Sequence, residues 1–274
     1  MSRRPAHSRS ALPTGCAACW GRVNPLRLDG IPDGVQVLLP FLAERVPFTA
    51  DGWYYPDDPA LRPGRHPYHE AGLYYIQEAS AMIPAALCPP RPGERGLDLC
   101  AAPGGKATQL AGALRGQGLL VANEIHPGRA AVLSGNIERM GIPNALVLNM
   151  EPQALAERFP GFFDRIVVDA PCSGEGMFRK EAVAVTQHCE ALVKQCAALG
   201  AQILDNAAAC LAPGGEMIYS TCTFAPEEDE GQVAAFLQRH PEFTLADVFG
   251  NVAMPPSGSQ CARCRRQGLP PAAW

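Results

Sequence analysis

Two short polar segments of the sequence each place a cysteine next to other reactive side chains. One reads Asp169-Ala-Pro-Cys172-Ser-Gly-Glu-Gly and follows a β-branched run, and the other reads Ser220-Thr-Cys222-Thr and follows a second apolar run. Such apolar runs predict buried strands. A buried strand does not need to end in an acid, a proline and a thiol for packing alone. Because thiolates are nucleophiles that form covalent intermediates, these segments predict a site of thiol chemistry.

A glycine turn and a later acid indicate the ligand of that site. The segment Asp98-Leu-Cys-Ala-Ala-Pro-Gly104-Gly105-Lys106 ends one predicted strand and precedes a helix. Such a turn brings backbone without side chains close to a ligand at the sheet edge. It matches neither the dinucleotide fingerprint nor a P-loop. Glu124 ends the next strand, roughly 20 residues on, where nucleoside-binding α/β proteins place an acid for ribose hydroxyls. Together these features favour an adenosyl ligand over a purely structural turn.

The elements that must position these segments alternate between strands and helices. Strands are predicted at 97–100, 119–124, 145–149, 164–170 and 216–221, and helices at 106–114, 128–140, 152–159, 190–211 and 226–239. Helices of this length between strands imply right-handed crossovers and a doubly wound, mostly parallel sheet of the α/β class. The strands at 164–170 and 216–221 are expected to be neighbours. That order would place Cys172 and Cys222 across one cleft.

Composition bounds the class of protein. The 274 residues are 47% hydrophobic and 18% charged, which suffices for one sizeable core and a small appendage. The sequence contains no apolar stretch of membrane-spanning length and no signal core after its basic start, so a cytoplasmic location is expected. A net charge of −4 gives no support to binding a long duplex by charge alone, although it does not exclude a local basic patch.

Eleven cysteines are many, but most predict packing rather than disulfides or metal binding. Cys88, Cys196 and Cys210 lie in apolar segments and are expected in the core. Cys16-x-x-Cys19 and Cys261-x-x-Cys264 lie at opposite ends of the chain without further ligands at zinc spacing. Five histidines also show no ligand spacing, so no metal is expected; they are His66, His69, His126, His188 and His240.

The motifs together resemble one family. The segment Asp169 to Lys180, D-A-P-C-S-G-E-G-M-F-R-K, is similar to the signature of the NOL1/NOP2/Sun family of RNA 5-methylcytosine methyltransferases, in its bacterial 16S ribosomal RNA subgroup. The D-L-C-A-A-P-G-G-K and S-T-C-T segments match equally well, and Pro67 to Glu78 fits the lead-in region. The resemblance covers about residues 21 to 250. It implies a Rossmann-like methyltransferase core, S-adenosyl-L-methionine as cofactor, and RNA with an unstacked cytosine as partner.

The resemblance also assigns roles. It implies that Cys222 is the nucleophile that adds to carbon 6 of cytosine and that Cys172 helps to release the methylated product. Asp169 is expected to hydrogen-bond the cytosine ring edge, and Lys106 to stabilise charge beside it and to lower the thiol pKa. The implied cofactor-binding residues are Cys100, Ala101, Ala102, Pro103, Gly104, Gly105, Lys106, Glu124, Arg129, Asn149 and Asp169. Where the family has an adenine-contacting aspartate, this chain offers Asn149 or Glu151.

Other residues have two interpretations. Met177 and Phe178 suit the core or contact with RNA equally, whereas Arg179 and Lys180 are expected to face RNA phosphates. The run Trp53-Tyr54-Tyr55 suits core packing better than stacking on a base.

Four segments are expected along the chain. Residues 1–20 lack periodicity and are expected to be disordered, 21–90 form a loop-rich subdomain on the RNA side, and 91–250 form the catalytic domain. Residues 251–274 match nothing in the resemblance, so the chain looks truncated at both ends. A sixth strand is predicted at 244–248. In the family, a last strand inserts between the fifth and sixth strands. Because residues 251–274 do not match that strand, a bare sheet edge is expected here.

Three functions therefore remain open. The leading one is cytosine-5 methylation of RNA, with ribosomal RNA favoured over transfer RNA. The second is a catalytically impaired fragment that binds RNA or cofactor. The third is a different adenosyl enzyme, such as an amino-methyltransferase, which needs no paired cysteines.

Overall fold

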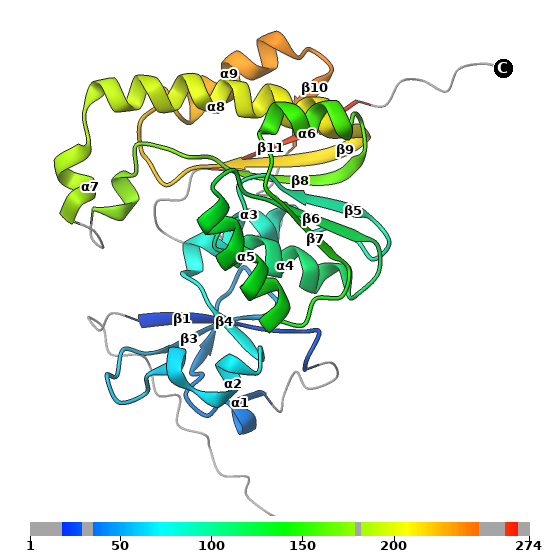
Figure 1. Cartoon of the computed structure of the whole chain (residues 1–274). Helices are drawn as coiled ribbons and strands as arrows, with labels where there is room; N and C mark the ends of the chain where they lie inside the picture. Colours follow the sequence, from blue (N-terminus) through cyan, green and yellow to red (C-terminus); the bar gives the residue numbers. More distant parts are fainter. Residues whose placement is uncertain (1–17, 29–34, 179–181, 247–260, 268–274) are drawn as a thin grey trace, which may run out of the picture.

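The computed structural model describes residues 18–28, 35–178, 182–246 and 261–267, which form two β-sheets with helices around them. The small sheet and its short helices lie at one end of the molecule, and the large sheet with its long helices at the other (Figure 1). Within the described ranges no helix is both long and apolar enough to cross a bilayer.

The small sheet is antiparallel, with the order β2-β3-β1-β4. Its elements are β1 Ala18–Val23, α1 Val35–Leu38, β2 Glu44–Arg45, β3 Gly52–Pro56, η1 Pro63–Arg65, α2 Pro67–Glu70 and β4 Tyr74–Ile76. Trp53 and Tyr55 on β3 are 6% and 5% exposed. The core-packing interpretation of these two rings is therefore confirmed, and Tyr54 between them is half-buried.

The large sheet has seven strands in the order β10-β11-β9-β8-β5-β6-β7. Its strands are β5 Arg95–Asp98, β6 Leu119–Asn123, β7 Ala145–Leu148, β8 Phe163–Asp169, β9 Leu211–Ser220, β10 Phe243–Leu245 and β11 Cys261–Arg266. The five strands from β9 to β7 are parallel, and β11 pairs antiparallel with both β9 and β10. This mostly parallel, doubly wound arrangement confirms the predicted fold class.

Helices cover both faces of this sheet (Figure 1). One face carries α3 Ala79–Leu87, α4 Gly105–Leu114 and α5 Pro127–Arg139, and the other carries α6 Pro152–Arg158, α8 Glu190–Cys210 and α9 Glu230–Arg239. Successive strand residues point to opposite faces. Ile166 and Val168 pack with the residues of α8, while Val167 packs with those of α4. Burial on both faces is why the strand appears as a continuous apolar run.

The edge that was expected to be bare is paired, so that expectation is wrong. β11 lies between β9 and β10, with Cys264 opposite Met217. Cys264 is buried in the core, whereas exposed Arg265 pairs with Glu216. This inside–outside alternation is a strand pattern. The arginine- and cysteine-rich composition of the segment concealed it.

Smaller differences concern element ends and cysteines. β9 begins at Leu211 and includes the Pro213-Gly214-Gly215 turn that was expected to precede it, and α9 begins at Glu230 rather than 226. Cys88 and Cys210 are buried as expected, but Cys196 is only half-buried. Among the described residues, no three His, Cys, Asp or Glu side chains gather into a metal-binding group. Cys16, Arg179 and Lys180 lie outside the described residues.

Candidate active site

The glycine turn lies at the carboxyl edge of the large sheet, between β5 and α4. Gly104 has a φ of 114°, in the region that favours glycine, and a Cβ there would lie 3.2 Å from Leu133 Cδ1. α4 begins at the next residue, Gly105, and no side chain caps it. The glycine turn therefore lies at the start of a helix, as the sequence predicts, and Gly104 itself is buried against α5.

An acid, an arginine and an amide lie beside this turn. The buried Glu124 carboxylate accepts a hydrogen bond from the His126 backbone N–H at 3.0 Å and pairs with Arg129 at 3.3 Å. Arg129 also donates to the Ala102 carbonyl at 2.9 Å, which connects the acid to the glycine turn. Asn149 Nδ2 donates to the Glu124 carbonyl at 2.6 Å. The structure thus brings Glu124, Arg129 and Asn149 together, while Glu151 precedes α6 and is exposed.

The two cysteines face one another across the ends of β8 and β9. These strands pair in parallel with Asp169 opposite Ser220, so the segments that follow leave from the same edge. The Sγ atoms of Cys172 and Cys222 lie 3.2 Å apart, although 50 positions separate them in sequence. The Cys222 backbone N–H also donates to Cys172 Sγ at 3.4 Å. The predicted neighbouring strands therefore do place both thiols in one site.

The hydrogen bond between the thiols makes them unequal. It is the largest influence lowering the pKa of Cys222, and the Lys106 charge lowers that pKa further, against burial and the Asp169 charge. The same hydrogen bond is the largest influence raising the pKa of Cys172, and burial adds to it. In such a coupled pair one sulfur ionises first and the other keeps its proton. Of the two thiols, Cys222 is therefore the one that ionises more readily.

Asp169 connects the thiols to the glycine turn. Its Oδ2 lies 2.6 Å from Lys106 Nζ, and its Oδ1 accepts a hydrogen bond from Ser220 Oγ at 2.8 Å. The Lys106 side chain is mostly buried, while that of Asp169 is 37% exposed. Lys106 extends from the first turn of α4. A cation, an acid and two thiols thus meet at one edge of the sheet.

Asp98 is a residue to which the sequence interpretation gave no role. It ends β5 and is 1% exposed, and the backbone N–H groups of Cys100 and Ala107 lie near its carboxyl group. Burial raises the pKa of Asp98 to about 7, although the nearby Lys106 charge opposes that rise. The acid that begins the D-L-C-A-A-P-G-G-K motif was the available signal, because Asp is seldom fully buried at the end of a strand.

A second set of residues escaped the sequence interpretation. Ser173, Glu175, Thr223 and Glu228 form a loop-bridging network between the two cysteine segments. Ser173 Oγ lies 2.9 Å from Thr223 Oγ1, and the Ser173 backbone N–H donates to Glu228 Oε2 at 2.8 Å. Glu175 Oε2 accepts from Thr223 Oγ1 at 2.8 Å and from the Phe224 N–H at 2.7 Å. These bonds hold both cysteines in place, and only the density of polar residues after each strand hinted at them.

The cysteine segments also approach one another through their backbones. The Gly176 N–H donates to the Cys222 carbonyl at 2.6 Å, and a Cβ on Gly176 would lie 2.7 Å from that oxygen. Glycine is required here by close approach. Met177 and Phe178, which follow, are half-buried, and Phe178 packs edge-on against His188 at 5.3 Å.

Comparisons with known proteins agree with this geometry. A family model described as 16S rRNA methyltransferase RsmB/F matches residues 85–270, and one for the N-terminal domain of 16S rRNA methyltransferase RsmF matches residues 21–79. The first match extends beyond residue 250, where the resemblance seen in the motifs ends. A solved structure titled as a methyltransferase homolog protein from Pyrococcus horikoshii has a TM-score of 0.75 and 29% identity, and covers 91% of this chain and 86% of that one.

Curated relatives give the same family. Ribosomal RNA small subunit methyltransferase F of Klebsiella pneumoniae is 38% identical over 243 residues, which are 85% of this chain and 50% of the relative. The protein of that name from Escherichia coli is 35% identical, over 83% of this chain and 50% of its own length. The chain therefore spans about half the length of the curated relatives it matches. Because the first family model matches more than half of the chain, the chain belongs to the RsmB/F family of 16S rRNA methyltransferases.

Proposed function

We propose that this chain carries the catalytic centre of a methyltransferase that modifies carbon 5 of cytosine in ribosomal RNA, with S-adenosyl-L-methionine as cofactor. The observation that carries the proposal is the 3.2 Å approach of Cys172 and Cys222 beside the Lys106–Asp169 pair. A purely structural turn does not require two thiols at the same polar edge of the sheet. Ribosomal RNA is favoured over transfer RNA because the curated relatives are named as ribosomal RNA methyltransferases.

The residues at the sheet edge fit the proposed cofactor. The Glu124 carboxylate suits the ribose hydroxyls, and Arg129 connects it to the turn from Cys100 to Gly104, which suits the methionine portion. Asn149 suits the adenine because its amide already lies beside Glu124. When bound, S-adenosylmethionine supplies a methyl group on a positively charged sulfur.

The Cys222 thiolate supplies the activation that carbon 5 of cytosine needs. Its sulfur bonds to carbon 6, and the electron pair of the ring double bond moves toward carbon 5, which then accepts the methyl group. Loss of the carbon-5 proton and breaking of the carbon 6–sulfur bond restore the ring and the thiolate. Covalent catalysis of this kind divides one difficult step into easier ones.

The thiol pair accounts for the order of these steps. Once the Cys222 sulfur is bonded to carbon 6, it no longer accepts the hydrogen bond that raises the pKa of Cys172. Cys172 can then give up its own proton and take the carbon-5 proton, which completes release. Asp169 faces the ring edge and supports protonation at nitrogen 3, while Lys106 holds Asp169 in place.

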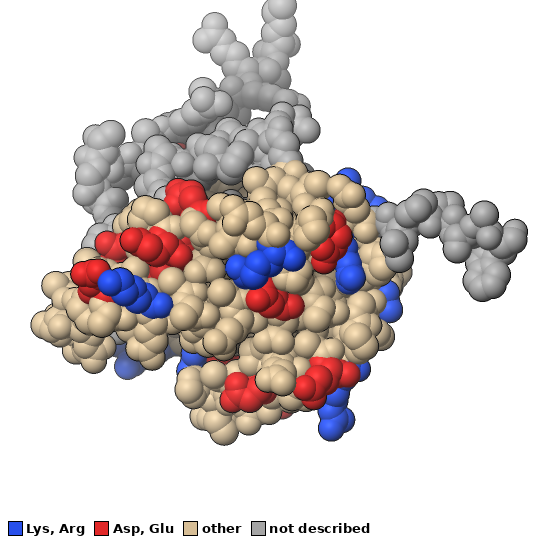
Figure 2. All heavy atoms as spheres, turned by 90° about the horizontal axis from the view of Figure 1, so that it is seen from above, with Lys and Arg blue, Asp and Glu red and all other residues tan. Residues whose placement is uncertain are grey.

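The RNA-facing surface is inferred from charge and placement. The face above α8 and α9 shows acidic and basic side chains interspersed among uncharged ones (Figure 2). Such a face does not gather the positive charge that phosphates require. We place RNA on the side of the cysteine segments because the thiols lie there. The target cytosine must leave its stack to reach the thiols, and we place this enzyme in the cytoplasm.

Release of tritium from RNA carrying 5-tritiated cytosine tests the function. The wild-type chain should release tritium, and Cys222→Ala should reduce release at least a thousandfold because no covalent adduct forms. Cys172→Ala should instead accumulate protein–RNA adduct on denaturing gels, since elimination is blocked. Exposed Cys189→Ala is the matched control and should behave as wild type.

Each alternative predicts a different result. Wild-type turnover by Cys222→Ala would remove Cys222 from the nucleophile role. Binding of S-adenosylmethionine by the unaltered chain without tritium release would indicate a non-catalytic fragment. Full methylation after replacing both cysteines would indicate another adenosyl chemistry, such as amino-group methylation.

A further inference from the structure

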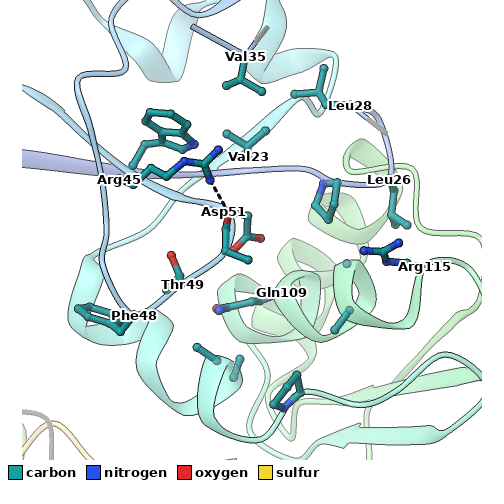
Figure 3. Close-up of a pocket in the computed structure, with 18 residues that line it drawn as sticks. Val23, Leu26, Leu28, Val35, Arg45, Phe48, Thr49, Asp51, Gln109 and Arg115 are labelled. Atoms are coloured by element: carbon teal, nitrogen blue, oxygen red, sulfur yellow. Dashed lines mark hydrogen bonds between the residues drawn. The ribbon is translucent and has the colours of Figure 1, made fainter. Parts of the chain in front are cut away.

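A pocket lies between the small sheet and helices α3 and α4, away from the cysteines. It has a volume of about 650 Å³, within the range of roughly 300 to 1,000 Å³ usual for ligand sites. None of the proposed catalytic or cofactor-binding residues lines it. Its wall includes the later turns of α4, which begin one turn beyond Lys106 (Figure 3).

The pocket contains a buried polar atom that has no partner. Gln109 is 7% exposed, and its side chain extends from α4 toward the loop between β2 and β3 that carries Thr49 and Asp51 (Figure 3). Its Nε2 donates to the Met82 carbonyl at 3.1 Å, which fixes the orientation of the amide. Its Oε1 is buried and has no hydrogen-bond partner among the described residues. A buried acceptor left in this state costs free energy, so it indicates a ligand that donates an N–H or O–H group.

The rest of the lining indicates the shape and charge of that ligand. Trp53 and Phe48 provide aromatic surface beside apolar residues such as Val23. The Arg45 guanidinium lies over the Trp53 ring, 4.6 Å from its centroid. Arg115 adds a second, exposed cation on the opposite wall (Figure 3). A flat apolar body with an inner donor and an outer anion would satisfy these groups together.

We propose that this pocket binds a nucleoside monophosphate group. Its base lies against half-buried Phe48 and the apolar wall and donates its exocyclic amine to Gln109, and its phosphate lies at Arg115. The group is either an unstacked nucleotide of the RNA or a free mononucleotide. The RNA source rests on the proposed function, whereas binding of the nucleotide itself does not. Adenine, cytosine and guanine carry the amine, and uracil does not.

The first experiment measures binding of nucleoside 5′-monophosphates to the full chain by calorimetry and by Trp fluorescence. AMP or CMP should bind at least fivefold more tightly than UMP, because uracil has a carbonyl where adenine and cytosine carry the exocyclic amine that donates to Gln109 Oε1. Arg115→Gly should weaken AMP binding at least fivefold. This variant keeps the fold because Arg115 has a φ of 50°, which glycine adopts without strain.

Arg62→Gly is the matched control. Arg62 is also an exposed arginine with a positive φ, of 37°, but it does not line the pocket, so its replacement should leave AMP binding unchanged. Gln109→Leu is a second test of the inner contact and should remove the preference for AMP over UMP. Equal binding of all four mononucleotides by every variant, or no binding by any of them, would overturn the proposal.

A second experiment identifies the source of the nucleotide. If the pocket holds a nucleotide of the RNA, Arg115→Gly should raise the KM for RNA at least fivefold with kcat unchanged, and AMP should compete with RNA. If it holds a free mononucleotide, AMP binds and the KM for RNA stays constant. Mononucleotide binding without any methylation would refute the proposed function and leave the pocket assignment intact.

Discussion

At the level of single residues, the state of Cys222 depends on one neighbouring thiol. The hydrogen bond from Cys172 lowers the pKa of Cys222, so the Cys222 thiolate should be present at a lower pH than an ordinary thiolate. Alkylation by iodoacetamide, followed by mass spectrometry of the peptide, should therefore give a pH midpoint for Cys222 below that of N-acetylcysteine. Cys172→Ala should shift this midpoint to higher pH because the donor is lost.

Cys172→Ser tests whether hydrogen-bond donation or side-chain shape at position 172 sets the pH midpoint of Cys222. Cys172→Ser keeps a hydroxyl that can donate, so its midpoint should lie between those of the wild type and Cys172→Ala. An unchanged midpoint in Cys172→Ala would mean that Lys106 alone lowers the pKa of Cys222.

At the level of elements, catalysis depends on how the segments after β8 and β9 are held together. Thr223 is 1% exposed and connects Ser173 to Glu175 in the loop-bridging network. Thr223→Val keeps the shape of the side chain and removes these bonds, each worth about 1 kcal/mol. We expect kcat to fall about tenfold or more, since about 1.4 kcal/mol corresponds to a factor of ten. The affinity for S-adenosylmethionine should not change.

Two variants control for this result. Thr223→Ser retains the hydroxyl and should recover most of the kcat, which a role in packing alone would not produce. Thr186→Val removes an exposed hydroxyl that bonds to the Val183 carbonyl within helix α7 (Ala182–Gln187) and should have no effect. A wild-type kcat in Thr223→Val would show that the segments stay aligned without the network.

The sequence predicted elements well where periodicity decides their position. The continuous apolar run of β8 required burial on both faces, and the alternation of strands and helices required a mostly parallel order; both are found. β11 was missed because its Arg and Cys residues hid a period of two. Glu175 and Glu228 were missed because contacts between loops 50 residues apart leave no periodic trace in the sequence.

At the level of the whole molecule, the small sheet is joined to the catalytic edge by a buried arginine. Arg22 on β1 is 0% exposed, and its guanidinium donates to Gln77 Oε1 at 3.1 Å and to Thr108 Oγ1 on α4 at 2.5 Å. It also pairs with Asp51 at 3.3 Å. A single arginine in the short strand segment A-C-W-G-R-V gives no sequence signal of this role. Helix α4, which Arg22 contacts through Thr108, also carries Lys106 of the catalytic edge.

Replacing Arg22 tests whether the two sheets depend on one another. Arg22→Met fills similar volume but leaves the partly exposed Asp51 carboxylate without its partner, which costs about 3 kcal/mol, the lower end of the range for buried pairs. We expect the free energy of unfolding to fall by that amount in urea titrations. The corresponding loss in Tm is on the order of 10 °C for a chain of this size. Exposed Arg91→Met is the control and should change stability by less than about 0.5 kcal/mol. If Arg22→Met were as stable as the control, the small sheet would be held against α4 by its apolar contacts alone. Arg22 would then not be what joins the small sheet to the catalytic edge.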